Sequence, residues 1–302
     1  MEGYVSQYRS RPNTYLPLEF SRQPSIVIMG DGYTTADFGQ FEATAKKMVD
    51  DLFSVSPFSQ EPFCNYFNIF FVYLNSEVRG IGVGKPKNTP LRCYFHPDYP
   101  ETIVFDDVNF LGGRKAASPF DVAEQFVPGI NLNNTVVVVL VNSTQTGYTT
   151  GCLDVAPYGK WISIISDNSD PVEFKRMVLR EVGGKGFARL SEEDGYFSAD
   201  FRKMITDRYT KYGFYANVDV TSNPALVRWS RFLSYDVIYP ELGIFSAGNG
   251  VTRPDNDNVM LVRGALRYDA PSREAIIKRI FQIHEWDYND LAFIHYFVDN
   301  PI

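Results

Sequence analysis

The sequence predicts an α/β fold with a mixed, mostly parallel sheet. Short β-branched runs alternate with segments whose apolar residues recur at helical spacing, and hydrophobic residues make up 44% of the 302 positions. This alternation is typical of a sheet with helices on both sides, and the composition supports a sizeable core. We expect an N-terminal extension over residues 1–24 and a single domain over residues 25–302.

The first part of the chain follows a β-α-β pattern. Residues 25–29 form a β-branched apolar run closed by Gly30-Asp31-Gly32, which indicates a buried strand ending in a turn. Apolar residues at helical spacing over 37–53 predict a helix, and the apolar run 67–74 predicts a second strand. Residues 83–113 are rich in Gly, Pro, Asn and Asp, so we expect a loop that forms one wall of a cleft.

A helix with a clear start is predicted further along the chain. Asp170 is a good N-cap, Pro171 suits the first helical position, and Glu173 suits the first turn. The pair Gly183-Gly184 should end or distort this helix, which we expect to finish by Gly186. Further elements are expected at 118–127 (helix), 135–141 and 161–165 (central strands), and 272–283 and 287–298 (helices).

Charge and composition exclude several classes of protein. The net charge is −7 and the Lys and Arg residues are scattered, which argues against a nucleic-acid partner. No apolar run approaches the roughly 20 residues of a membrane span, and the first residues lack the apolar core of a signal peptide. The three cysteines form no CxxC pair, so neither a disulfide framework nor a cysteine zinc site is indicated.

A set of ordered motifs resembles the IgA-peptidase family, zinc metallopeptidases of gut bacteria. Residues 180–194 read REVGGKGFARLSEED, which is similar to the family signature of His-Glu, one or two small residues, Gly-His, then Phe, Ala, Leu, Ala and Asp-Glu-Tyr. Other stretches match in the same order: GDGYT at 30–34, PF to FN at 62–68, NVDVTS at 217–222 with Trp229, GVTRP at 250–254, NVM at 258–260, and REAI at 273–276.

The resemblance implies a zincin-like, three-layer α/β/α architecture similar to a collagenase catalytic domain. It places Glu181 as the family's general base. The first zinc-binding histidine falls on Arg180, and the second falls on Lys185, in a frame one residue longer than HExxH, or on Gly184 at the shorter spacing. The acidic ligand falls on Glu192. The remaining vestigial positions are the next acid, Glu193, Asp194 in place of tyrosine, and Met260 as the methionine floor.

Two residues outside that motif are candidates for a cleft. Asp31 lies between two glycines, where a structural turn residue is also expected. His96 lies in the predicted cleft loop and is the imidazole best placed for compensating chemistry. Neither it nor the other two histidines, His284 and His295, lies at ligand spacing from Glu181, so structural roles are expected for all three.

Arg180 and Lys185, at the positions of the family's histidines, bear on whether the protein can hold zinc. Arginine stays protonated and lysine loses its proton only at a steep cost, so neither substitutes for a zinc-binding imidazole. We therefore expect no zinc cofactor, and we expect Arg180 or Lys185 to lie within ion-pair range of Glu181 or Glu192.

Three hypotheses stay open, and whether the protein is an enzyme depends on them. The first is an inactive peptidase-like protein, a pseudoenzyme, that keeps a cleft for a peptide or glycoprotein. The second is a hydrolase whose metal, calcium or magnesium rather than zinc, is held by carboxylates. The third is a structural interaction module. By analogy with the family, we expect export to the periplasm or cell surface.

Overall fold

In the computed structural model of the protein, the described residues are 2–8, 22–105, 118–152, 159–195, 197–235, 238–261, 264–289 and 293. The chain forms two compact units. Unit 1 consists of Met1–Phe53 and Cys64–Val182, and unit 2 consists of Ser54–Phe63 and Gly183–Ile302. The single-domain organisation expected for residues 25–302 stays a prediction.

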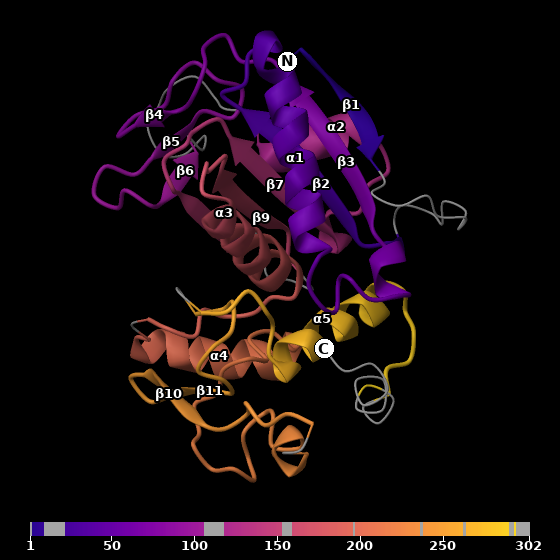
Figure 1. The fold of residues 1–302 in the computed structure, drawn as a ribbon, viewed down its shortest axis with the longest axis vertical. Coiled ribbons are helices and arrows are strands. Elements are labelled where there is room, and N and C mark those ends of the chain that lie inside the picture. The colour runs from indigo at the N-terminus through magenta and orange to yellow at the C-terminus, as the bar shows by residue number, and fades with distance from the viewer. Residues whose placement is uncertain are drawn as a thin grey trace. The chain divides into compact units, whose positions relative to one another are not determined.

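Unit 1 contains a six-stranded sheet in the order β1-β3-β2-β7-β9-β8 (Figure 1). The four inner strands run parallel to one another, and β1 and β8 pair antiparallel at the two edges. This confirms the α/β class and the mostly parallel sheet. The strand bounds are β1 Gly3–Tyr8, β2 Ser25–Asp31, β3 Asn68–Leu74, β7 Thr135–Val141, β8 Tyr148–Cys152 and β9 Trp161–Ser166.

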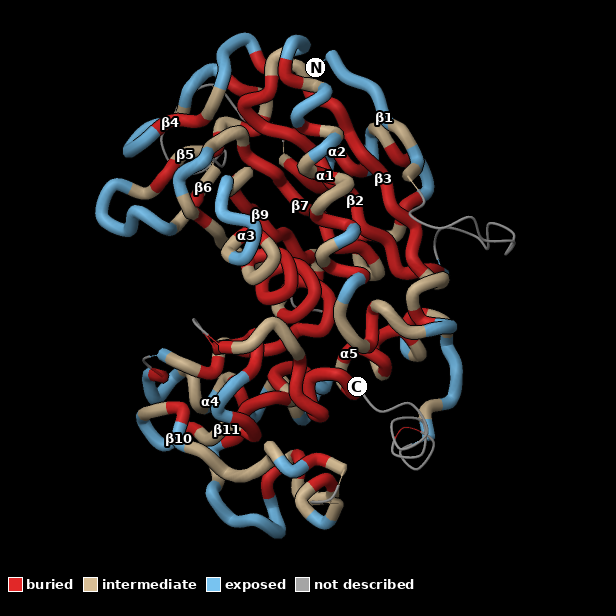
Figure 2. Tube along the Cα trace, viewed as in Figure 1, coloured by how far each residue is buried: buried red, intermediate tan, exposed pale blue. Residues whose placement is uncertain are grey.

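Helices cover both faces of this sheet, which is why the inner strands read as continuous apolar runs. Every residue of the four inner strands is buried, as Figure 2 shows in red. On one face, Phe41 of α1 (Phe38–Leu52) makes an edge contact with Phe71 of β3. On the other face, Phe120 of α2 (Pro119–Phe126) belongs to a buried cluster with Val137 and Val139 of β7.

Two segments of unit 1 differ from the sequence predictions. The loop expected over residues 83–113 contains short strands, and the prediction was wrong there, because β4 Gly82–Val83, β5 Cys93–Phe95 and β6 Ile103–Phe105 form a separate small sheet. Residues 106–113 lie outside the described part. Within the predicted N-terminal extension, β1 pairs with β3, and Tyr4 stacks on Tyr73 with ring centroids 4.2 Å apart.

The helix that carries Glu181 begins where the sequence predicts. The Asp170 carboxylate accepts hydrogen bonds from the backbone N–H groups of Val172 (2.9 Å) and Glu173 (3.2 Å), and α3 spans Pro171–Met177. The chain continues as a π-helical segment over Val178–Phe187, one residue beyond the predicted end. The glycine pair therefore lies within the π-helix, which confirms that it distorts the helix rather than ending it at once.

Unit 2 has little sheet and is built from helices and irregular segments. Its elements are α4 Ala199–Tyr212, the hairpin β10 Phe245–Gly248 and β11 Val251–Arg253, and α5 Ala270–Ile283. Helix α5 starts two residues earlier than predicted, because Asp269 serves as the N-cap and accepts from the Ser272 N–H at 2.8 Å. The helix expected over 287–298 falls largely outside the described residues.

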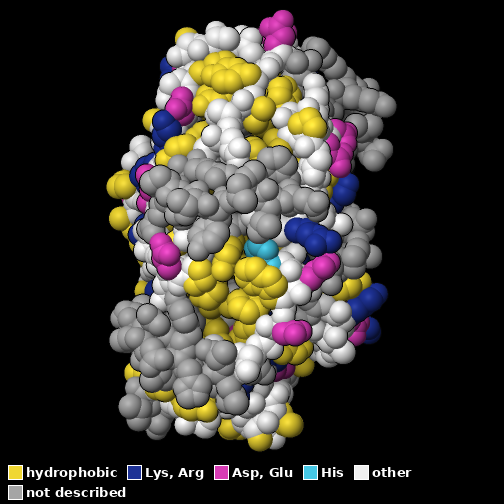
Figure 3. Space-filling view, turned by 90° about the vertical axis from the view of Figure 1, so that its right-hand side faces the viewer, with side chains coloured by type: hydrophobic (Ala, Val, Ile, Leu, Met, Phe, Trp, Pro, Cys, Tyr) yellow, Lys and Arg dark blue, Asp and Glu magenta, His cyan; other side chains and the backbone are white. Residues whose placement is uncertain are grey.

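The surface agrees with the scattered charge of the sequence. On the face in Figure 3, Lys and Arg side chains are interspersed with Asp and Glu. None of the helices within the described ranges has the length and apolar character that a membrane crossing requires.

Candidate functional site

Two hydroxyl groups, one from the edge strand β8 and one from its neighbour β9, hold Glu181 in unit 1. Its side chain is 1% exposed. The Thr150 hydroxyl of β8 donates to Glu181 Oε2 at 2.6 Å, and the Ser163 hydroxyl of β9 donates to the Glu181 backbone carbonyl at 2.8 Å. Thr150 and Ser163 are direct partners across the two strands and so share one sheet face. The sheet edge thus fixes both the carboxylate and the backbone of this helical residue.

Arg180 supplies the positive charge beside that carboxylate. Its Nε lies 3.5 Å from Glu181 Oε1, and the Arg180 side chain is only 6% exposed. The guanidinium also lies over the ring of Tyr148 on β8, 5.2 Å from the ring centroid, within the range of a cation–π interaction. Arg180 is therefore fixed between an acid and an aromatic ring.

Lys185 makes the second predicted pair, within unit 2. Its Nζ lies 2.8 Å from Glu192 Oε1, with the Lys185 side chain 15% exposed and that of Glu192 40% exposed. The prediction that a cation at position 180 or 185 would lie within ion-pair range of Glu181 or Glu192 is confirmed twice, by Arg180 with Glu181 and by Lys185 with Glu192. Asp194, another of the vestigial positions, is partly buried.

The π-helix bears on the choice between the two motif frames. Hydrogen bonds in a π-helix run from residue i to i+5, so positions 180 and 185 are one turn apart there, as i and i+4 are in an α-helix. The longer frame, with Lys185 rather than Gly184 at the second position, fits this geometry. Arg180 and Lys185 are hydrogen-bond donors with no lone pair to offer a cation. The side chains at these positions do not fit a zinc ion.

Glu193 is the centre of a buried polar network in unit 2. Its carboxyl group accepts from the side-chain amides of Asn217 and Asn258, each at 2.8 Å, and the Asn258 amide also donates to Asp269 at 3.0 Å. Burial, with the Asp269 charge nearby, raises the pKa of Glu193 well above its ordinary value of 4.5. Burial likewise raises the pKa of Asp269 to about 6. Burial thus disfavours the charged form of Glu193, while the two amide donors favour it.

Segments far apart in the sequence meet at this network. The Asn217 side chain pairs with both backbone groups of Ser191, at 2.9 and 2.8 Å. The Arg253 guanidinium donates to the Glu193 carbonyl at 3.1 Å, and the buried Met260 accepts from the Glu193 N–H through its own carbonyl at 3.2 Å. Three of the stretches that resemble the family, at 217–222, 250–254 and 258–260, thus meet at Glu193.

The cleft candidate Asp31 serves as an internal anchor in unit 1. It is fully buried at the end of β2, and its carboxylate accepts from the Thr89 hydroxyl (3.0 Å) and from the N–H groups of Leu91 (3.1 Å) and Cys93 (2.9 Å). Burial raises the pKa of Asp31 despite these hydrogen bonds. These contacts agree with the structural role that was also expected for Asp31, because its carboxylate fastens the loop that leads into β5.

His96, the other cleft candidate, lies just after β5 and is partly buried. Its ring packs beside Tyr99, with centroids 5.0 Å apart, and Nδ1 accepts from the Asp98 N–H at 3.2 Å. These contacts fit the structural role expected for this histidine.

Thr150, Ser163 and Tyr148 were missed by sequence reasoning. They lie 31, 18 and 32 residues before their helical partners, and only the pairing of β8 with β9 brings them to the helix. A run of Tyr, Thr and Thr at 148–150 is compatible with a strand, and that signal could have identified β8.

Comparison with known proteins agrees with these motifs. The sequence matches the family model described as IgA Peptidase M64 over residues 20–241, which is more than half of the chain and includes Glu181, Glu192 and Glu193. The motifs at 250–276 lie beyond the matched range. No curated protein matches the chain.

Proposed function

Because the chain belongs to the IgA Peptidase M64 family, we propose that it is a metallopeptidase-fold protein without peptidase activity that binds a peptide or glycoprotein. We infer the three-layer architecture of a zincin for unit 1, from its sheet with helices on both faces. By analogy with exported members of the family, we place the protein outside the cytoplasm.

The observation that best supports the loss of activity is the ion pair of Arg180 with Glu181. In a zinc peptidase, the glutamate activates a metal-bound water, so its carboxylate must be free to accept a proton from that water. Here one carboxylate oxygen faces the Arg180 guanidinium and the other accepts from the Thr150 hydroxyl. Both oxygens are thus engaged, and the side chain is almost fully buried.

A hydrolase with a carboxylate-bound metal is less well supported. The four acids for such a site are Glu181, Glu192, Glu193 and Asp194. Glu181 and Glu192 are paired with cations, Asp194 is partly buried, and both Glu193 oxygens accept from amides in a site where burial raises its pKa. Calcium and magnesium are bound by carboxylate oxygens that are available to the ion.

The feature that supports peptide binding is strand β8. It is the last strand of the six-stranded sheet within the described residues. The Ser166 N–H donates to the Gly147 carbonyl at 3.0 Å, so by the alternation of antiparallel pairs the backbone groups of Thr149 face β9 and those of Thr150 face the outer edge. The outward N–H of Tyr148 already donates to the Glu101 carbonyl at 2.9 Å, so an added strand would pair from Thr150 onward. An extended peptide can add to such an edge through main-chain hydrogen bonds.

A peptide-library experiment tests both parts of the proposal. The purified protein is incubated with a random-sequence peptide library, and retained peptides and cleavage products are measured by mass spectrometry. We expect intact peptides to be retained and no products to appear. Specific cleavage would refute the loss of activity, and the absence of retained peptides would refute the binding role.

Two substitutions at one position locate the binding edge. Thr150→Pro removes the outward N–H, and proline is tolerated on edge strands, whereas Thr150→Val removes only the hydroxyl. Peptide retention should fall in the proline variant and persist in the valine variant, with melting temperatures measured for both. Equal retention by the two variants would contradict binding at β8.

A further inference from the structure

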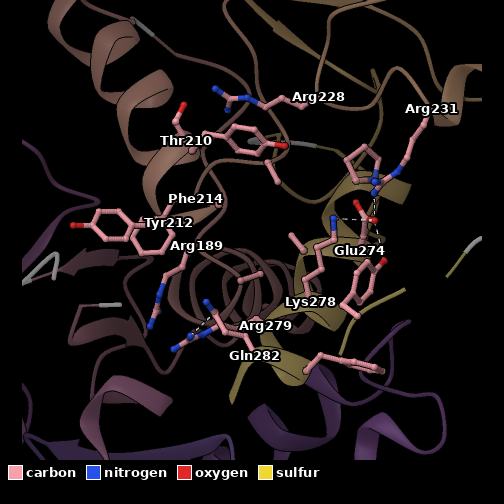
Figure 4. A pocket seen from close by; sticks show the side chains of 18 of the residues that line it. Arg189, Thr210, Tyr212, Phe214, Arg228, Arg231, Glu274, Lys278, Arg279 and Gln282 are labelled. Carbon is pink, nitrogen blue, oxygen red and sulfur yellow. Dashed lines mark hydrogen bonds and ion pairs between the residues drawn. The ribbon is translucent and has the colours of Figure 1, made fainter. Parts of the chain in front are cut away.

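Unit 2 contains a pocket of about 670 Å³. It lies among the C-terminal turn of α4, one side of α5, and the segments around residues 188–189, 213–216 and 228–232 (Figure 4). This volume is within the range of sites that bind small molecules, roughly 300 to 1,000 Å³. All described lining residues belong to unit 2, and Glu181 is not among them.

Aromatic side chains are concentrated in this pocket. They make up seven of the 20 described lining residues, against 15% of the whole chain. Two of the seven, Phe214 and Phe232, are buried, and the other five keep exposed surface. Accessible rings in a pocket of this size favour a flat, apolar ligand body. The five are Tyr209, Tyr212, Phe281, Trp286 and Tyr288.

The rings near the end of α5 are held by one another. Phe281 makes edge contacts with Trp286 and Tyr288, with ring centroids 5.6 and 5.7 Å apart. Trp286 also stacks on His284, with centroids 4.3 Å apart, and yet it is 41% exposed. A tryptophan whose ring is already oriented by its neighbours loses little side-chain entropy when a ligand ring packs on it.

Charged side chains also line the pocket, and they have partners within unit 2. The Arg228 guanidinium lies 3.9 Å from the ring centroid of Tyr209, and Arg279 donates to Oε1 of Gln282 at 2.8 Å. The charge of these side chains therefore does not define the ligand.

Glu274 supplies a hydrogen-bond acceptor in the pocket wall. Arg231, Lys278 and the Tyr288 hydroxyl all contact the same oxygen, Oε1, Lys278 at 3.3 Å and Tyr288 at 2.8 Å. Figure 4 shows the dashed lines from Arg231 and Lys278 meeting at Glu274. Within the described part of the chain, no hydrogen bond or ion pair involves Oε2.

The second oxygen of Glu274 is thus suited to accept from a ligand. A carboxylate accepts hydrogen bonds through both of its oxygens. Glu274 is only 7% exposed and lines the pocket, and a carboxylate withdrawn from water is stabilised by a donor.

We propose that this pocket binds a small, uncharged aromatic molecule that carries an N–H or O–H donor. Its ring packs on Trp286, and its donor bonds to Glu274 Oε2. Tyr288 connects the two groups, because its ring contacts Phe281 and its hydroxyl donates to Glu274. The ligand is uncharged because Glu274 is already paired with two cations, which would repel an ammonium group. This site is separate from the peptide-binding edge proposed for unit 1.

Matched small molecules test the proposal by isothermal titration calorimetry. The probes are indole with N-methylindole, which lacks the donor, and phenol with cyclohexanol, which lacks the flat ring. At least one of indole and phenol should bind at millimolar concentration. Its partner should bind at least about tenfold more weakly, through loss of the hydrogen bond or of the ring contact. Equal affinity within either pair, or no binding of indole and phenol, would overturn the proposal.

Variants place the binding in this pocket. Trp286→Leu removes the exposed ring and should weaken binding of the preferred probe at least about tenfold. Tyr99→Leu is the matched control, because Tyr99 is a 65% exposed aromatic residue of unit 1, outside the pocket. That variant should bind the probe as the parent does.

Glu274→Gln tests the acceptor. The amide oxygen can replace Oε1 among its three donors, which leaves an N–H group in place of Oε2. The preference for indole over N-methylindole should then disappear. Melting temperatures show whether each variant folds, and Trp286→Leu covers the case in which Glu274→Gln does not, since it changes an exposed residue. Unchanged affinity in Trp286→Leu, or an unchanged preference in folded Glu274→Gln, would contradict the site.

Discussion

Removal of the Arg180 charge should destabilise the protein because the buried Glu181 carboxylate then loses this cation. Arg180→Met keeps an apolar chain of similar reach and removes the guanidinium. Breaking a buried ion pair by deleting one partner costs about 3 to 5 kcal/mol. Here the distance of 3.5 Å is long for a charge-assisted hydrogen bond, and Thr150 continues to donate to Glu181. These two facts lower the expected loss to about 1 to 4 kcal/mol, including the cation–π contact with Tyr148.

The double variant separates charge from packing. In Arg180→Met with Glu181→Gln, no buried carboxylate remains, so we expect it to be more stable than Arg180→Met alone. The assay is urea unfolding of the parent, both single variants and the double variant, which gives the coupling between the two side chains. A coupling of about 1 kcal/mol or more would support the account.

Two results would show that the pair does not contribute to stability. If Arg180→Met unfolds at the same urea concentration as the parent, or if the coupling is near zero, the pair does not stabilise the protein. Lys203→Met is the matched control, because it removes a cation from an exposed i,i+4 pair with Asp207. That variant should be indistinguishable from the parent.

Two further predictions concern pH and metal. Burial raises the pKa of Glu193 above its ordinary value and that of Asp269 to about 6, so the native state holds protons that the unfolded chain releases. Both groups stabilise the protein below about pH 4, and the contribution of Asp269 is lost as the pH rises through about 6. Asp269→Asn should flatten the dependence of the urea midpoint on pH between 4 and 7, and an unchanged slope would contradict the coupling. Arg180→His with Lys185→His should bind zinc only weakly by calorimetry, because tight binding also depends on outer groups that orient the ligand histidines and the two substitutions add none. Tight stoichiometric binding would show that the site needs only its ligands.

The inner strands and the start of α3 could be predicted because their signals are local. Residues 135–141 are five valines with a leucine and a threonine, and the strand has these bounds. The cap of α3 consists of Asp170 and the proline that follows it. Each pattern predicts its element from a few consecutive residues.

Elements with weak apolar patterns were missed. Helix α4 has one buried residue, Ile205, among its 14, so no apolar stripe identifies it. Ser198 caps its start and Gly213 follows its end with a positive φ, and these two signals could have found it. Strand β8 is short and polar, and its position at the sheet edge depends on pairing with β9.

The sequence predicted the charged residues of the candidate site but not the residues that hold them in place. The motif placed two cations and two acids near one another, and the balance of charge required them to pair. The hydroxyl groups that hold Glu181 come from other strands, and the role of Glu193 depends on Asn217 and Asn258, which are distant in sequence. Such long-range partners have no signature in a single sequence.

Metal analysis of the purified protein tests most directly whether this chain binds zinc. The resemblance assigns the family's zinc-binding positions to Arg180 and Lys185, and each of these cations is paired with an acid. We predict zinc far below one equivalent per chain and a melting temperature that a chelator leaves unchanged, since a bound ion would stabilise the native state by mass action. Zinc near one equivalent, with a melting temperature that falls when the chelator removes it, would contradict the account.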